Sequence, residues 1–427
     1  MKKVKRRAQE EKKIKILTLG DHPLLPSGVG TQSKYVFEAL LKTKKFQIVS
    51  MGGAINHNDH NKQTVSPWGE DFVIYPVDGY GDENVIRSVI RSEKPDIVWF
   101  MTDPRFYEWL WNIENEIRPN MPMVYYHVWD NFPAPKFNKP FYDSTDVIVS
   151  ISKLTDDIVN EVSSDTVDKY YIPHAVNQEI FKPLSKEVVD EFKEAAMPFL
   201  KEDDFVFFWN NRNARRKQSG SLLFWFKEAL SKNDNLKLIM HTDPKDPNGQ
   251  DLVAIISELE LQGKVYLSQD KVPPENLALL YNAVDCTINI SDAEGFGLAT
   301  LESLACGTPI IVNKTGGLQD QITTKAGAAC GIGLDPSSRA VIGSQQVPWI
   351  YEDRLDQEKV VAAILDMAAA TPEQYAEWSS NGLAHVDEFF NFEKFEKKWV
   401  KVMKDTHRKY GSWPNKKYNS WKFTEIK

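Results

Sequence analysis

The stretch that decides the fold runs from Ser291 to Gln321 and is SDAEGFGLATLESLACGTPIIVNKTGGLQDQ. It begins where a short apolar run ends at Ile290, which predicts a buried strand. Gly295 and Gly297 bracket a turn, and the leucines and alanines after the turn recur at helical spacing. A strand, a glycine turn and a helix in this order predict one unit of a parallel sheet with helical crossovers.

The start of the predicted helix after Gly297 is a candidate binding site for a diphosphate. Its first N–H groups have no partner within the helix and carry a partial positive charge, and the glycines let an anion come close to the backbone. Glu294 and Glu302 flank this helix start, and eight residues of helix would separate them by about 12 Å, so they cannot hold the same atom. A nucleotide sugar carries hydroxyl groups on both sides of its diphosphate and would use both acids.

Outward from this stretch, strand-like and helix-like segments alternate along most of the chain, which is typical of α/β proteins. A chain of 427 residues is also long enough for two domains. The predicted strands are Ile14–Gly20, Phe46–Met51, Phe72–Val77, Asp96–Met101, Met123–His127, Val147–Ser150 and Lys169–Pro173 in the first half, and Phe205–Trp209, Leu236–His241, Lys264–Leu267, Cys286–Ile290 and Pro309–Val312 in the second.

Charge is distributed unevenly. The net charge is −8, but residues 1–15 carry +6, so the remainder carries −14. The acidic body argues against nucleic acid as a ligand. The basic tail is either a solvated extension or a weak peripheral contact with an anionic membrane. No apolar run approaches the roughly 20 residues that span a bilayer, and the N-terminus has no secretory apolar segment, so we expect a cytoplasmic protein, at most peripheral at the inner face of a membrane.

The stretch 291–321 resembles the glutamate–seven–glutamate motif of the retaining glycosyltransferases called glycosyl transferases group one, a family that includes sucrose synthase and bacterial mannosyltransferases. Glu294 matches the first glutamate, EGFG (294–297) its loop and Glu302 the second glutamate. ACGTPII (305–311) and TGG (315–317) match the strand and turn that follow. The resemblance implies a GT-B fold, with two Rossmann-like domains facing each other across a cleft, and transfer with retention of anomeric configuration.

A second patch, NNRNARRKQSG (210–220), follows the strand FVFFW. Arg212 and Lys217 match the family's two cations, which would neutralise the diphosphate as it leaves. Arg215 and Arg216 lie between them, so the patch offers four cations for two roles. A solvated basic loop is the alternative interpretation.

In the first half, SGVG (27–30) matches the glycine-rich loop with which the family approaches the donor phosphate. A dinucleotide site is a weaker alternative, because Ser33 occupies the third glycine position, and a plain tight turn is another. The resemblance also implies that His127, at the end of the strand VYYH, points into the cleft, where Asp130 would orient it or bind the acceptor. His174 is expected to be structural or to line the cleft.

These assignments give one predicted site. The catalytic residues are Glu294, His127, Arg212 and Lys217. The donor-binding residues are Gly28, Gly30, Arg212, Lys217, Val272, Glu294, Gly295, Phe296, Gly297, Leu298 and Glu302, with Val272 in a loop that would hold the base. His127 and Asp130 are expected at the acceptor. No metal and no cofactor are expected, since basic side chains and the helix terminus supply the positive charge.

The expected domains are a basic flexible tail (1–13), an N-terminal Rossmann-like acceptor domain (14–175), a linker (176–203) and a C-terminal Rossmann-like nucleotide-sugar domain (204–390). A C-terminal helix (391–410) is expected to pack back on the N-terminal domain, and a tail (411–427) follows it.

The predicted function is transfer of a sugar from a nucleotide-diphosphate sugar, with UDP- and GDP-sugars favoured, to a carbohydrate, lipid-linked or other hydroxyl acceptor. Two alternatives stay open. One is a GT-B disaccharide phosphorylase, and the other is a non-catalytic protein that binds a nucleotide sugar.

Overall fold

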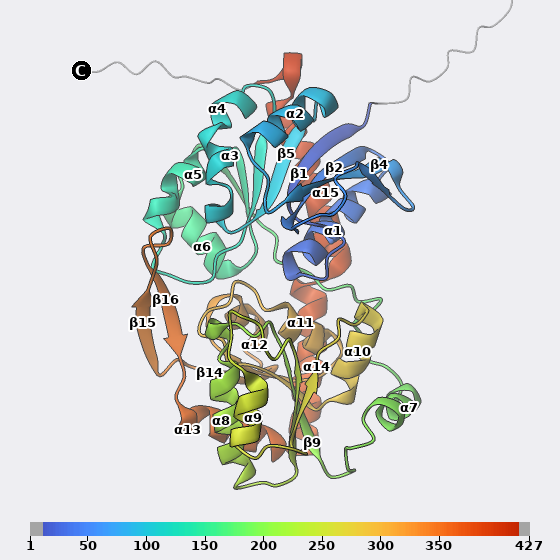
Figure 1. Cartoon of the computed structure of the whole chain (residues 1–427), viewed down its shortest axis with the longest axis vertical. Helices are drawn as coiled ribbons and strands as arrows, with labels where there is room; N and C mark the ends of the chain where they lie inside the picture. Colours follow the sequence, from blue (N-terminus) through green and yellow to red (C-terminus); the bar gives the residue numbers. More distant parts are fainter. Residues whose placement is uncertain (1–11, 418–427) are drawn as a thin grey trace, which may run out of the picture.

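Apolar strands and amphipathic helices build one parallel sheet in each half of the chain, and the two halves lie one above the other (Figure 1). The computed structural model describes residues 12–417. The first 11 residues of the expected basic tail and residues 418–427 of the expected C-terminal tail lie outside the described residues. Within residues 12–417, no helix combines the length and apolar character needed to cross a membrane.

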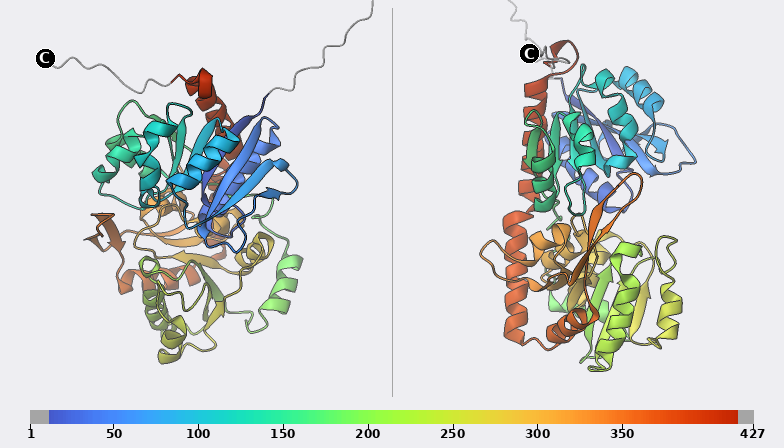
Figure 2. Two further views of the ribbon diagram at one scale, coloured as in Figure 1. Left: turned by 45° about the horizontal axis from the view of Figure 1, so that its top comes forward. Right: turned by 90° about the vertical axis from the view of Figure 1, so that its left-hand side faces the viewer.

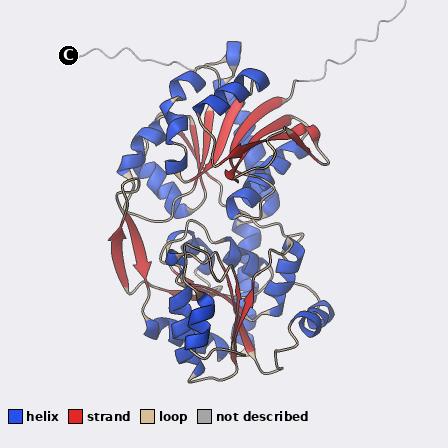
Figure 3. Cartoon of the chain, in the orientation of Figure 1, coloured by secondary structure: helices blue, strands red, loops and turns tan. Residues whose placement is uncertain are grey.

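The N-terminal sheet has eight strands in the order β3-β4-β2-β1-β5-β6-β7-β8, parallel throughout except where β3 meets β4. Every residue of β5, β6 and β7 is buried, because helices cover both faces of the sheet (Figure 3). The strands are β1 (Ile14–Asp21), β2 (Phe46–Ile55), β3 (Gln63–Val65), β4 (Gly69–Asp78), β5 (Ile97–Thr102), β6 (Met123–His127), β7 (Val147–Ser150) and β8 (Asp168–Tyr171). The helices are α1 (Gly28–Lys42), α2 (Glu83–Glu93), α3 (Glu108–Asn112), α4 (Glu114–Ile117), α5 (Lys139–Asp143) and α6 (Lys153–Val162).

The C-terminal sheet has six parallel strands in the order β11-β10-β9-β12-β13-β14. They are β9 (Phe205–Asn210), β10 (Leu236–His241), β11 (Val265–Ser268), β12 (Cys286–Asn289), β13 (Ile310–Asn313) and β14 (Gly331–Leu334). The helices between and after them are α8 (Ser219–Leu230), α9 (Leu252–Glu258), α10 (Pro274–Ala283), α11 (Leu298–Ala305), α12 (Gln319–Ile322), α13 (Gln357–Ala368) and α14 (Pro372–Phe389). One further helix, α7 (Lys186–Ala196), lies in the segment between the two sheets.

Each sheet grows in both directions from its first strand, so the strand order reverses between β1 and β5 and again between β9 and β12. In open α/β sheets, the loops at the carboxyl ends of the strands beside such a reversal part and leave a crevice for a ligand. A ligand-binding site is therefore expected at these two crevices.

The last helix, α15 (Phe392–Tyr410), runs on from α14 and returns to the N-terminal domain (Figure 2). Its Trp399 is fully buried and packs edge-on against Tyr126 of β6, with ring centroids 4.7 Å apart. Phe392 packs in the same way against Tyr35 of α1 at 4.8 Å. The chain therefore crosses between the domains twice, once after β8 and once between α14 and α15.

Each strand predicted from the sequence is present, but the structure adds strands that the prediction lacks. These include β14 and a two-stranded antiparallel hairpin, β15 (Ser338–Ile342) and β16 (Ile350–Arg354), whose tip reaches toward the N-terminal domain (Figure 1). The hairpin strands are mostly exposed or half-buried and β14 contains two glycines. None of these segments has the apolar run that identifies a buried strand.

Candidate functional site

The loops that follow β9 and β12 meet in the crevice of the C-terminal sheet. The two strands are hydrogen-bonded neighbours, so the segments after their carboxyl ends lie side by side. Lys217 comes from the first loop and Glu294 from the second, and Lys217 Nζ donates a hydrogen bond to Glu294 Oε2. Only 7 % of Lys217 and 9 % of Glu294 is exposed. The structure thus brings two residues 77 positions apart into one buried ion pair.

Burial and charge act in opposite directions on this pair. Burial alone would raise the pKa of Glu294, but the charges of Lys217 and Arg216 outweigh it and hold that pKa below its ordinary value. Burial lowers the pKa of Lys217 in spite of the opposing charge of Glu294. A buried charge at this position would destabilise the fold if its partner were absent. The two side chains therefore stay paired and present a fixed cation and a fixed carboxylate in the crevice.

Arg216 adds a second cation and connects the two domains. Its Nη1 donates to the carbonyl oxygen of Ala293 at 2.9 Å and lies 3.8 Å from Glu294 Oε2. Its Nε lies 3.5 Å from Oδ2 of Asp130, which follows β6 in the N-terminal domain. Lys217, Arg216, Glu294 and Asp130 thus form one charge cluster of two cations and two carboxylates. Asp130 is its one member from the N-terminal domain.

Two helices of eight or more residues begin beside this charge cluster. Gly297 precedes α11 with φ +88°, and a Cβ there would lie 2.4 Å from Leu318 Cδ2, so glycine is needed both for the backbone angle and for the space. Among the described residues no side chain caps α11, so its first N–H groups are available to an anion. Gly28 begins α1 of the other domain, and a Cβ on Gly28 would lie 3.2 Å from Leu298 Cδ1. The starts of α1 and α11 thus approach each other across the cleft.

Glu302 lies one helix length away, in a different environment. Its Oε2 accepts a hydrogen bond from the hydroxyl of Tyr281 on α10 at 2.8 Å, and that hydroxyl accepts one from Asn210 at the end of β9, also at 2.8 Å. Burial raises the pKa of Glu302 to about 7. A neutral carboxyl group here can both donate and accept a hydrogen bond, and an ionised one would need hydroxyl or N–H donors.

Within residues 12–417, no group of three or more His, Cys, Asp or Glu side chains is arranged to hold a metal ion. The three cysteines of the chain, Cys286, Cys306 and Cys330, are buried free thiols.

Comparison with known proteins agrees with this geometry. Residues 190–377, which contain Lys217, Glu294 and Glu302, match the family model described as glycosyl transferases group 1. The matched segment is the C-terminal half of the chain, from the region before β9 into α14.

Two similar curated proteins illustrate the relationship. The alpha-monoglucosyldiacylglycerol synthase of Streptococcus pneumoniae is 28 % identical over 187 residues, which cover 43 % of this chain and 41 % of the relative. The D-inositol 3-phosphate glycosyltransferase of Corynebacterium jeikeium is 27 % identical over 205 residues, covering 46 % and 48 %. The aligned region thus spans less than half of each of these relatives.

Solved structures resemble the whole chain. The sucrose-phosphate synthase of Thermosynechococcus elongatus superimposes with a TM-score of 0.72 and 17 % identity over 93 % of this chain and 100 % of that one. The Anabaena protein Alr3699/HepE in complex with UDP and glucose superimposes with a TM-score of 0.67 and 14 % identity over 92 % and 99 %. The fold is therefore GT-B, with two parallel-sheet domains facing each other across a cleft, as the sequence predicted.

Within the segment that matches the family model, the predicted pair of cations is divided. Lys217 lies in the buried cluster, but Arg212 donates from Nε to Asp246 Oδ2 at 2.7 Å and its side chain is 65 % exposed. Arg216 is the arginine beside Glu294. Sequence spacing did not identify Arg216, because four cations within six residues give no means of telling which one turns inward.

The expectation that His127 points into the cleft is wrong. The side chain is fully buried in the N-terminal domain, with Nδ1 3.0 Å from the Tyr125 hydroxyl and Nε2 2.5 Å from the Tyr142 hydroxyl. Burial lowers the pKa of His127 to about 3. A neutral imidazole with both nitrogens engaged and no access to solvent is a structural group, since strands β5 to β7 and their helices enclose the end of β6.

Asp130, by contrast, lies where an interdomain residue was expected. Besides facing Arg216, its Oδ1 would lie 2.9 Å from a Cβ added to Gly295. Because Gly295 has no Cβ, the loop that carries Glu294 can pass directly beside the carboxylate of Asp130 from the N-terminal domain. Gly30 lies inside the first turn of α1, where its N–H donates to the capping hydroxyl of Ser27 at 3.0 Å.

Phe296 and His174 turn away from the charge cluster. Phe296 is buried and its ring lies 4.9 Å from that of His174 and 5.7 Å from that of Phe390. His174 Nδ1 lies 2.7 Å from the hydroxyl of Tyr126. This aromatic group fills the junction between the domains, so only the backbone of Phe296 could reach a donor. Val272 is half-buried in the loop before α10, the helix that carries Tyr281.

Proposed function

We propose that this protein transfers a sugar from a nucleotide-diphosphate sugar to a hydroxyl acceptor with retention of anomeric configuration. The observation that carries the proposal is the buried Lys217–Glu294 pair beside the uncapped start of α11. A fixed cation, a helix terminus and a carboxylate around one crevice suit a ligand that carries a diphosphate next to a sugar. The Anabaena protein of the same fold is in complex with UDP-glucose, which supports a nucleotide sugar as the donor class.

Each residue has a role in this scheme. As the bond between the anomeric carbon and the diphosphate breaks, negative charge builds on the leaving oxygen, and Lys217, Arg216 and the N–H groups of α11 stabilise it. Glu294 binds hydroxyl groups of the donor sugar and orients it. The acceptor oxygen bonds to the anomeric carbon, and its proton passes to the leaving diphosphate. Glu302 accepts hydrogen bonds from the ribose. Retention is carried over from the family resemblance.

The reaction needs no resident metal or cofactor in this proposal, because the positive charge comes from two side chains and a helix terminus. Turnover that is unchanged by EDTA and by added Mg²⁺ or Mn²⁺ is the expected result.

The first experiment is a thermal-shift screen with UDP-, GDP- and ADP-sugars, in which one class is expected to raise the melting temperature. Turnover with that donor is then measured for Glu294→Gln and Lys217→Ala, with Lys186→Ala as a control. Lys186 also pairs with a carboxylate, Asp190, but it lies exposed on α7. Loss of turnover in the two site variants and not in the control is expected. Wild-type turnover in folded site variants would refute the assignment.

The screen also separates the two alternatives. A phosphorylase would bind inorganic phosphate and gain no stability from any nucleoside diphosphate. A non-catalytic binder would gain stability from a nucleotide sugar without releasing the nucleoside diphosphate.

A further inference from the structure

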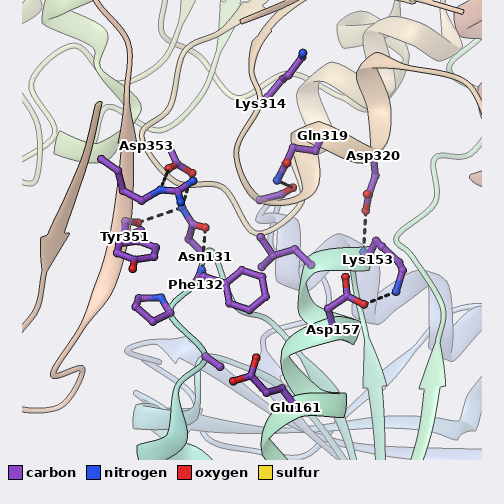
Figure 4. Close-up of a pocket in the computed structure, with 15 residues that line it drawn as sticks. Asn131, Phe132, Lys153, Asp157, Glu161, Lys314, Gln319, Asp320, Tyr351 and Asp353 are labelled. Atoms are coloured by element: carbon purple, nitrogen blue, oxygen red, sulfur yellow. Dashed lines mark hydrogen bonds and ion pairs between the residues drawn. The ribbon is translucent and has the colours of Figure 1, made fainter. Parts of the chain in front are cut away.

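Beside the loop of Glu294, the two domains and the hairpin line a cavity of about 580 Å³ that is open to solvent and that the donor scheme does not use (Figure 4). Its N-terminal wall is the segment after β6 together with α6. Its C-terminal wall is the turn after β13 together with α12, and β15 and β16 close the third side. The volume lies within the roughly 300–1,000 Å³ that is usual for small-molecule sites.

Hydrogen bonds between the domains fix the walls on two opposite sides. On the hairpin side, Asn131 Nδ2 donates to Asp353 Oδ2 at 2.7 Å, and the N–H of Tyr351 donates to the carbonyl oxygen of Phe132 at 2.6 Å. On the other side, the N–H of Lys153 at the start of α6 donates to Asp320 Oδ2 at 2.8 Å. Figure 4 shows Asn131 beside Asp353 on one flank and Lys153 beside Asp320 on the other. The cavity is therefore a preformed space held open by contacts on both flanks.

The cavity and the charge cluster share one wall. Gly316 lines the cavity, and a Cβ on Gly316 would lie 1.7 Å from the carbonyl oxygen of Glu294 and 2.7 Å from that of Asp130. One turn of backbone thus separates the cavity from the first glutamate. Glu302 is hydrogen-bonded through Tyr281 to Asn210 at the end of β9, whereas the cavity residue Gly316 follows β13, on the other side of β12 in the strand order. A donor that extends from Glu302 to Glu294 leaves the cavity at its sugar end, where the acceptor has to approach.

The lining is polar but offers no surplus positive charge. Its three cations are already paired, Lys153 with Asp157, Lys314 with Asp335 and Arg339 with Asp353. Among the residues that the structure describes, Glu161 has no hydrogen-bond or ion-pair partner, and its carboxylate is directed into the cavity from α6 (Figure 4). The rings of Phe132 and Tyr351 add apolar faces. Free carboxylate oxygens beside aromatic rings suit hydroxyl groups and C–H faces better than a phosphate or an acyl chain.

We propose that this cavity is a distal acceptor subsite, which binds the part of a neutral, hydroxyl-rich acceptor, an oligosaccharide or glycoside, that lies away from the reacting hydroxyl. The hairpin β15–β16 is the wall that gives the subsite its selectivity. The assignment of this cavity as an acceptor subsite rests on the proposed transferase function. Its test does not, because carbohydrate binding to the cavity can be measured without turnover.

The test measures binding first. Maltotriose, cellotriose and mannotriose are added at millimolar concentration to the full-length protein in the presence of UDP, and ligand signals are followed by saturation-transfer NMR. Glucose 6-phosphate and a glucosyl-diacylglycerol in mixed micelles represent anionic and lipid acceptors. At least one neutral trisaccharide is expected to bind. Failure of all three, or binding of the anionic or lipid probe alone, overturns the proposal.

Two variants locate the binding. Glu161→Ala removes the unpartnered carboxylate, and Gln319→Trp fills the cavity from the exposed face of α12. Each is expected to weaken trisaccharide binding by roughly tenfold or more, while Glu194→Ala, an exposed glutamate on α7, leaves it unchanged. With an active donor, the two variants raise the acceptor KM and leave the donor KM and donor hydrolysis unchanged. Trisaccharide binding that both variants leave intact places it elsewhere and overturns the proposal.

The two proposals fail in different ways. If no nucleotide sugar binds but trisaccharides bind in the cavity, the transferase function fails and the carbohydrate subsite stands. If donor binding and turnover persist without any effect of the cavity variants, only the subsite fails.

Discussion

Protonation of Glu302 should make donor binding depend on pH in a way that one substitution removes. Burial raises the pKa of Glu302 to about 7 from an ordinary 4.5, and Tyr35, Tyr281 and Cys306 are the titratable groups that face it. All three stay neutral in this range, because burial raises their own pKa values. Ribose hydroxyls that donate to Glu302 favour its ionised form, so the donor must bind with loss of a proton below about pH 7.

The size of the effect follows from that pKa. If the donor binds only the ionised form, its affinity falls by about tenfold between pH 8 and pH 6, because nine in ten molecules are protonated at the lower pH.

The same raised pKa also affects the stability of the protein without a ligand. The folded-state pKa lies above the unfolded one, so Glu302 contributes stability below pH 4.5 that is lost as the pH rises through about 7, by at most about 3 kcal/mol.

Isothermal titration calorimetry measures both the affinity and the proton. Kd for the nucleotide sugar is determined between pH 5.5 and 8, in pairs of buffers that differ in ionisation enthalpy. Wild-type protein is expected to release close to one proton near pH 6 and none at pH 8. Glu302→Gln cannot ionise, so its affinity should be weaker at pH 8 and independent of pH.

Asp292 provides the control, since burial raises its pKa to about 6 and its side chain accepts a hydrogen bond from Gln218, whereas Glu302 accepts one from Tyr281. Asp292→Asn should retain the pH dependence of the wild type. A flat Kd in the wild type, or a pH dependence that survives in Glu302→Gln, would refute the placement of the ribose at Glu302.

Three further predictions concern the charge cluster and its surroundings. Lys217→Met leaves the buried charge of Glu294 with only the guanidinium of Arg216, 3.8 Å away, which should lower stability by about 3 kcal/mol; calorimetry should find that the double variant with Glu294→Gln recovers most of the loss, and no recovery would contradict the coupling. Arg216→Gln should reduce turnover by about a hundredfold, and Arg212→Gln by much less because that guanidinium is exposed beside Asp246; the opposite order in steady-state assays would show that Arg212 is the second cation. His127→Phe removes a hydrogen-bond partner from the buried hydroxyls of Tyr125 and Tyr142, although Tyr125 still donates to the carbonyl oxygen of Thr102. It should cost about 1–3 kcal/mol and leave turnover per folded molecule unchanged, and a lost kcat with an intact melting temperature would restore a catalytic role.

Most of the fold could be predicted because its central strands are buried on both faces. Such strands are short uninterrupted apolar runs, as in VYYH at 124–127, and they are visible in a single sequence. The hairpin gives no such signal. Its strands are mostly exposed or half-buried. The contacts that position it, such as that between Trp349 and Phe137 with ring centroids 4.9 Å apart, connect segments far apart in the chain.

The proximity of the helix start and the first glutamate could be predicted for a related reason. A helix start, its glycine and the two glutamates lie within ten residues, and a helix fixes their spacing, so sequence order and spatial order coincide. The orientation of a side chain at a strand end is different. His127 could face the cleft or the interior, and its neighbours Tyr125 and Tyr142 decide the matter through hydrogen bonds that spacing does not encode.

The acceptor side is the extreme case, because no continuous stretch of chain forms it. Asn131 follows β6, Gly316 follows β13 and Asp353 lies in the hairpin, and they meet only because two separate sheets and an added hairpin are docked against one another. A family motif can fix a diphosphate cradle, since backbone amides at a helix start bind any diphosphate in the same way. The acceptor differs from one enzyme to the next, so its walls have to come from segments that vary. That division explains why the sequence predicts a donor class, whereas the proposed acceptor subsite could be inferred only from the geometry of the docked domains.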